Sequence, residues 1–128
     1  MDLRNARGIK VTMDRIKEHI EVLKSALEYG ERILHNGTGS NYPTDKISRI
    51  VARIEELTDQ YVSLALDYDI EVTMAEQAIE KLSESEQKIA RARYIDGLPW
   101  RQVAAQTNYS VSHCRNKNLD IIKKVEGL

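Results

Sequence analysis

The strongest constraint on the fold is an apolar stripe that runs through the middle of the sequence without a helix-breaking residue. Apolar and aromatic side chains alternate there at spacings of three and four, as at positions a and d of a heptad repeat. They are Ile47, Ile50, Ile54, Leu57, Tyr61, Leu64 and Tyr68. Neither glycine nor proline occurs from Thr44 to Leu82. A single helix over that stretch would be about 55–60 Å long at about 1.5 Å per residue.

The pattern loosens after Tyr68, which leaves open whether the helix continues, although Val72, Ala75, Ile79 and Leu82 extend an apolar face. An apolar stripe of this length must be covered by another helix of the chain, by a second copy, or by both.

A second helical stripe lies near the start of the chain and predicts a helix from about Asn5 to His35. Its members are Ile9, Met13, Ile16, Ile20, Leu23, Leu27 and Leu34. The segment NGTGSNYPTD, from Asn36 to Asp45, is rich in Gly, Asn, Ser and Pro and predicts a loop. Two long helices joined by one loop predict an antiparallel helical hairpin over residues 1–82.

The last third of the chain contains the start and stop signals of three short helices. Ser83 and Glu86 have the spacing of a capping box, and Asp96-Gly97 predicts a turn after the first helix. Pro99 suits the first turn of a second helix, predicted from Trp100 to about Thr107.

The second and third of these helices are separated by only a few residues. Asn108-Tyr109 predicts a break, and Ser110 predicts the cap of a last helix that runs to about Val125. A tight break between two short helices is the layout of a helix-turn-helix unit. The sequence therefore predicts an all-α protein, with a helical hairpin over residues 1–82 and a three-helix DNA-binding unit over residues 83–128.

The apolar pattern supports this interpretation. Val103 and Ala104 fall where such units bury an aliphatic and a small residue, so that the two helices can cross closely. Asn108 stands where many units carry glycine, and asparagine tolerates the left-handed conformation that the turn requires. In the last helix we expect an inward stripe that comprises Val111, Cys114, Leu119, Ile122 and Val125.

The polar residues near the start of the last helix are then left facing outward, where a recognition helix meets base edges in the major groove. Arginine can read guanine and asparagine adenine with paired hydrogen bonds, whereas lysines and Arg101 would hold phosphates. We expect Lys124 to be one of these lysines. The predicted DNA-contacting residues are Ser110, Ser112, His113, Arg115, Asn116, Lys117, Arg101, Gln102 and Lys123.

Two aromatic residues of the unit have alternative interpretations. Trp100 is favoured as a core anchor over a residue that stacks on a base. For Tyr109, contact with a phosphate and a place in the core are equally compatible with the sequence.

Charge and composition agree with a nucleic-acid partner and give no sign of an enzyme. The chain has 128 residues and a net charge of -1. Residues 1–82 carry 11 basic and 15 acidic side chains, whereas residues 83–128 carry 8 basic and 5 acidic ones. A basic C-terminal part favours DNA as partner.

Other classes are not favoured. Cys114 is the only cysteine, which excludes an internal disulfide and favours a small buried hydrophobe. His19, His35 and His113 lie far apart without ligands at metal spacing, so we expect no metal, no cofactor and no catalytic set. Neither a signal segment nor a membrane span is visible, which predicts a cytoplasmic protein.

The segment LSESEQKIARARYIDGLPWRQVAAQTNYSVSHCRNKNLDIIKKV resembles the promoter-reading C-terminal region of bacterial sigma factors. It is more closely similar to the RinA/ArpU-like late transcriptional regulators of phages of Gram-positive bacteria. The resemblance covers residues 82–113 best, and the long helix with its loop more loosely. The matching residues are Arg93, Tyr94, Ile95, Asp96, Gly97, Trp100, Val103, Ala104, Tyr109, Ser110, Ser112 and His113. It implies a sequence-specific DNA-binding protein that controls phage late genes.

Two alternatives remain open. A small terminase subunit also combines a helix-turn-helix with helical oligomerisation, and it recognises DNA for packaging. A helical adaptor would instead bind RNA polymerase, or another protein, without reading DNA. For the regulator we expect a homodimer or higher homo-oligomer, because two-fold pairing doubles the DNA contacts. The hairpin would then mediate self-association or contact with RNA polymerase.

Overall fold

The protein is all-α, as predicted from the sequence. A computed structural model describes residues 1–35 and 44–127, which form helices and turns but no strand. The elements in chain order are α1 (Arg4–His35), α2 (Thr44–Ile79), α3 (Glu84–Ala90), the π-helical turn η1 (Arg91–Ile95), α4 (Trp100–Thr107) and α5 (Val111–Glu126). Residues 36–43, which include most of the predicted loop, lie outside the described residues.

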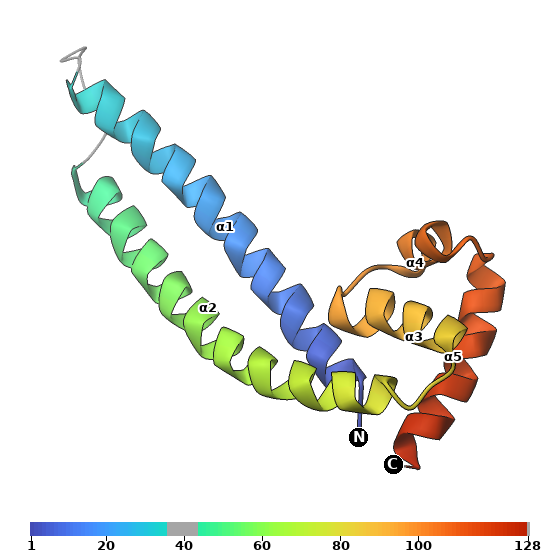
Figure 1. Cartoon of the computed structure of the whole chain (residues 1–128). Helices are drawn as coiled ribbons and strands as arrows, with labels where there is room; N and C mark the ends of the chain where they lie inside the picture. Colours follow the sequence, from blue (N-terminus) through green and yellow to red (C-terminus); the bar gives the residue numbers. More distant parts are fainter. Residues whose placement is uncertain (36–43, 128) are drawn as a thin grey trace. The chain divides into compact units, whose positions relative to one another are not determined.

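The two long helices run in opposite directions and form a helical hairpin (Figure 1). The long helix α2 continues past Tyr68 to Ile79, which answers the question that the loosened pattern left open. The predicted stripe is inward, since Ile50 and Leu57 are buried and the other heptad residues are half-buried.

The chain divides into two compact units at a point that the sequence analysis did not predict. One unit comprises residues 13–65, and the other comprises residues 1–12 together with residues 66–128. The expected boundary was at residues 82 and 83. The ends of both long helices thus belong to the same unit as the three short helices.

The core of this second unit explains the division. Leu3 and Ala6 of the first helix and Ala75 and Ile79 of α2 are buried in one cluster with the short helices. Three short helices alone bury little apolar surface, and small units of this kind need additional partners. The long helices supply the missing apolar surface.

Alanine allows these helices to approach closely. Six of the fifteen buried core residues are alanine, which has too small a side chain to hold neighbouring backbones apart. The larger side chains that fill the remaining space include Ile89, Val103, Ile121 and Val125, all at most 1% exposed. Even one added methylene is felt in such closely packed interiors.

The start of α3 is capped as predicted. The Ser83 hydroxyl accepts from the Glu86 backbone N–H, while the Ser83 N–H and hydroxyl donate to Glu86 Oε1 at 3.1 and 2.8 Å. The Glu86 side chain is only 3% exposed, and Lys124 Nζ of α5 lies 2.8 and 2.9 Å from its two carboxylate oxygens. This buried carboxylate therefore ties the start of α3 to the end of α5.

The ion pair predicts a pH-dependent contribution to stability. The Lys124 ammonium, assisted by Ser83, lowers the pKa of Glu86 from 4.5 to about 2. Because the pKa is lower in the folded protein, this contribution is present above pH 4.5 and is lost as the pH falls toward 2. Replacing Lys124 with Met leaves the buried carboxylate without its cation, and we expect a loss of about 2–3 kcal/mol at neutral pH.

Urea unfolding followed by circular dichroism at several pH values measures this effect. The difference between Lys124→Met and the unaltered protein should shrink as the pH falls below 4.5. Lys123→Met, which removes an exposed lysine from the next position, is the control and should change stability little. An equal loss for Lys124→Met at every pH would contradict the assigned role of Glu86.

Candidate nucleic-acid interface

The junction between α4 and α5 has the geometry of a tight helix-turn-helix. Asn108 ends α4 in the left-handed conformation, with φ 62° and ψ 23°. The Ser110 hydroxyl accepts from the His113 N–H at 3.0 Å and caps α5. Both features are those predicted from the residue types at these positions.

The two helices also cross closely. Val103 and Cys114 are fully buried, and Ala104 is 8% exposed. Thr107 Oγ1 donates to the Val103 carbonyl at 2.8 Å and lies 3.6 Å from Cys114 Sγ. The prediction that Cys114 is a small buried hydrophobe is confirmed.

The predicted inward position of Leu119 in α5 is wrong. Leu119 is 62% exposed, whereas Ile121 is fully buried and Ile122 half-buried against the core. At 3.6 residues per turn, a residue five positions after Cys114 lies about 140° away around the helix, while the seventh returns to the same side. The inner line is therefore Cys114, Ile121 and Val125.

The outward side of α5 presents a mixed polar and apolar line. Ser112, Asn116 and Lys123 lie opposite Cys114 on the helix and are exposed, and Leu119 joins them. Leu119 was not predicted on this surface, because its aliphatic side chain was expected in the core. Its methyl groups add an apolar surface among hydrogen-bonding side chains.

The remaining predicted contact residues lie around this line or on α4. Arg115 and His113 are exposed on the two flanks of α5, and Lys117 is half-buried. Ser110 is exposed in the turn, and Arg101 and Gln102 are exposed in the first turn of α4. Lys124 has a different role from the one expected, since its ammonium is engaged by Glu86.

The two aromatic residues take different positions. Trp100 is half-buried against the core, and the guanidinium of Arg93 lies 4.5 Å from its ring centre. Tyr109 is 38% exposed with its ring 4.5 Å from that of His113. The core position considered for Tyr109 is therefore excluded.

The π-helical turn η1 positions the flank of α5. Tyr94 is buried, and its hydroxyl donates to Asn118 Oδ1 at 2.6 Å. Burial raises the pKa of Tyr94, so that the phenol remains a donor. The Tyr68 hydroxyl of α2 donates to the Ile95 carbonyl at 2.8 Å. The sequence predicted a short helix here, but it did not predict a π-helical turn. Such turns often occur at functional sites.

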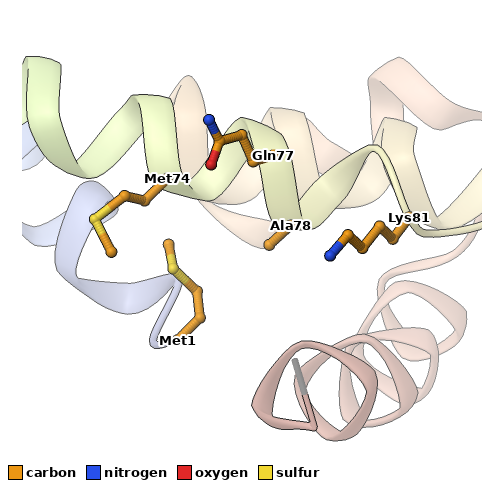
Figure 2. A pocket seen from close by; sticks show the side chains of 5 residues that line it. All are labelled: Met1, Met74, Gln77, Ala78 and Lys81. Carbon is orange, nitrogen blue, oxygen red and sulfur yellow. The ribbon is translucent and has the colours of Figure 1, made fainter.

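A pocket of about 320 Å³ lies elsewhere in the same unit (Figure 2). Its lining is Met1, Met74, Gln77, Ala78 and Lys81. Figure 2 shows the two thioethers on one side and the lysine ammonium on the other, with neither carboxylate nor imidazole between them. In the described part of the chain, no three His, Cys, Asp or Glu side chains gather as a metal site.

Comparisons with models of known protein families, with curated proteins and with solved structures gave no match. Among residues 1–35 and 44–127, no helix has the length and apolar content that crossing a membrane requires.

The left-handed turn residue offers a direct test of the junction. Asn108→Gly should leave stability nearly unchanged, because glycine adopts positive φ without steric conflict. Asn108→Val should lose about 1–2 kcal/mol, because a β-branched side chain is strained at that φ. Urea unfolding of both variants measures the difference, and equal stability of the two would rule out the left-handed turn.

Proposed function

We propose that this protein is a sequence-specific DNA-binding transcriptional regulator that reads the major groove with α5. The observation that carries the proposal is the exposed line of Ser112, Asn116, Leu119 and Lys123 on a helix held by a tight turn. Hydroxyl and amide groups can bond to base edges, and an apolar side chain can contact the thymine methyl group. Arg115 on one flank can reach guanine or a phosphate.

The polar and charged groups at the starts of α4 and α5 favour the same role. The exposed turn places His113 and Ser110 at the N-terminal end of α5, where free N–H groups favour an anion such as a phosphate. Arg101 and Gln102 begin α4 on exposed positions and can contact the backbone. DNA backbone contacts of this kind position a reading helix without specifying sequence.

The broader role follows from the resemblance of the sequence to RinA/ArpU-like phage regulators. It implies control of late genes of a phage or prophage, in the cytoplasm of a bacterial host. The proposal also includes a homodimer or higher homo-oligomer. Leu66, Ile70 and Met74, at intervals of four residues on α2 and 48–66% exposed, support self-association.

Selection from a pool of random duplexes at about 150 mM salt tests sequence reading. We expect the purified protein to enrich a defined motif. The double variant Arg115→Ala/Asn116→Ala should lose that motif, because the paired hydrogen bonds that Asn116 can make to a base are gone. Each lost base contact should reduce discrimination by about 1–3 kcal/mol.

A pool that stays random would refute the reading of DNA by α5 and favour an adaptor that binds RNA polymerase. A palindromic motif would give the spacing of two half-sites in a dimer. Ring assemblies of many copies, measured as mass in solution, would instead favour a DNA-packaging subunit.

A further inference from the structure

Three arginines from three separate elements gather on one flank of α5. Arg7 lies in the first helix, Arg93 in η1 and Arg115 in α5, all within one compact unit. Arg7 belongs to no motif of the sequence, and Arg93 is one of the residues that carry the resemblance to phage regulators. Their proximity arises from packing between segments that are far apart in sequence.

Two contacts bring these segments together. A Cβ at Gly97, which has φ +74°, would lie only 3.0 Å from Lys10 Cγ, so α1 passes directly beside the turn after η1. On the other side, the Tyr94 hydroxyl is hydrogen-bonded to Asn118. Arg7 precedes Lys10 by one helical turn, and Arg115 precedes Asn118 by one turn. Both therefore lie toward η1, where Arg93 is held.

Arg93 itself is fixed in place. Its Nη1 donates to the Leu98 carbonyl at 3.0 Å, and its guanidinium covers the Trp100 ring. Burial lowers the pKa of Arg93, and the positive charges of Arg7 and Arg115 lower it further. The guanidinium of Arg93 thus lies near enough to those of Arg7 and Arg115 to be repelled by both.

No carboxylate of the described residues forms an ion pair with these three arginines. In the described part of the chain, the ion pairs of Arg4, Arg53 and Arg91 are with Asp2, Glu56 and Glu76. None of the three clustered arginines has an ion pair among the described residues, and the buried Nε of Arg7 has no hydrogen-bond partner. Arg7 and Arg93 are half-buried, and Arg115 is exposed at their edge of α5. Partly buried charges are normally paired, so a cationic cluster without a carboxylate indicates an external anion.

We propose that Arg7, Arg93 and Arg115 bind one phosphate group of the DNA backbone beside α5, so that the first helix is part of the DNA interface. Guanidinium groups match phosphate oxygens with paired, charge-assisted hydrogen bonds. The inference rests on the proposed function, which supplies the DNA. It adds a contact from the opposite end of the chain and a reason for the missing counter-charge.

Fluorescence anisotropy with a labelled mixed-sequence duplex tests the phosphate contact. Arg7→Gln should weaken binding about tenfold for every sequence and reduce the slope of log affinity against log salt by about one. Arg7→Lys keeps the charge but not the paired donors. Its DNA affinity should lie between those of Arg7→Gln and the unaltered protein. Arg15→Gln removes an exposed arginine two turns further along α1 and should bind as the unaltered protein does.

Thermal unfolding separates binding from folding. Arg7→Gln should melt at the same temperature as the unaltered protein or higher, because repulsion within the cluster is relieved. Millimolar inorganic phosphate should raise the melting temperature of the unaltered protein more than that of Arg7→Gln. A large fall in melting temperature for Arg7→Gln would instead assign Arg7 a structural role and overturn the proposal.

The two measurements distinguish the failure of this inference from failure of the proposed function. Equal DNA affinity and salt slope for Arg7→Gln and the unaltered protein would overturn the phosphate contact while DNA binding stands. If neither protein binds any duplex, the proposed function and the DNA contact both fall. A phosphate effect that depends on Arg7 would then identify the cluster as a site for a free anion.

Discussion

The position of α5 depends on one shared core, because the three short helices do not enclose enough apolar surface by themselves. Leu3 and Ala6 from the first helix and Ala75 and Ile79 from α2 complete the cluster that buries Val103, Cys114 and Ile121. Alanine at many of the contacts lets the backbones approach closely. The same packing brings Arg7 beside η1, so the core that stabilises the unit also sets the charges around the candidate interface.

The two flanks of α5 differ in how their charges are balanced. On one flank, Lys124 is neutralised by the buried Glu86, which links α5 to the capped start of α3. On the other, Arg93 lies near Arg7 and Arg115, and none of the three has an ion pair among the described residues. A paired charge holds the helix in place, whereas unpaired like charges add repulsion to the free protein. This contrast is why the arginine flank, and not the lysine flank, is assigned to a ligand.

Local patterns predicted most of the elements. The Ser83–Glu86 capping box, the turn at Gly97, the left-handed Asn108 and the Ser110 cap all occur where the residue types predict them. These features depend on side chains bonding to nearby backbone or on which residues tolerate positive φ. The inner side of α5 was only partly predicted, because Leu119 and Ile121 are both aliphatic. The two residues differ in their angular position around the helix relative to Cys114, and their hydrophobicity does not reveal that position.

The sequence by itself determined the all-α class, the apolar stripe of the long helices, and the caps and turns that bound the three short helices. Each of these follows from local spacing and backbone preference. It also identified the polar side chains from Ser112 to Lys117, which flank the buried Cys114 and of which Lys117 alone is half-buried. Only the tertiary structure decided that both ends of the hairpin join the C-terminal core, that Lys124 is paired with Glu86, and that Arg93 lies near Arg7 and Arg115. These three facts depend on contacts between residues tens of positions apart, and the periodicity of a single helix carries no information about such contacts.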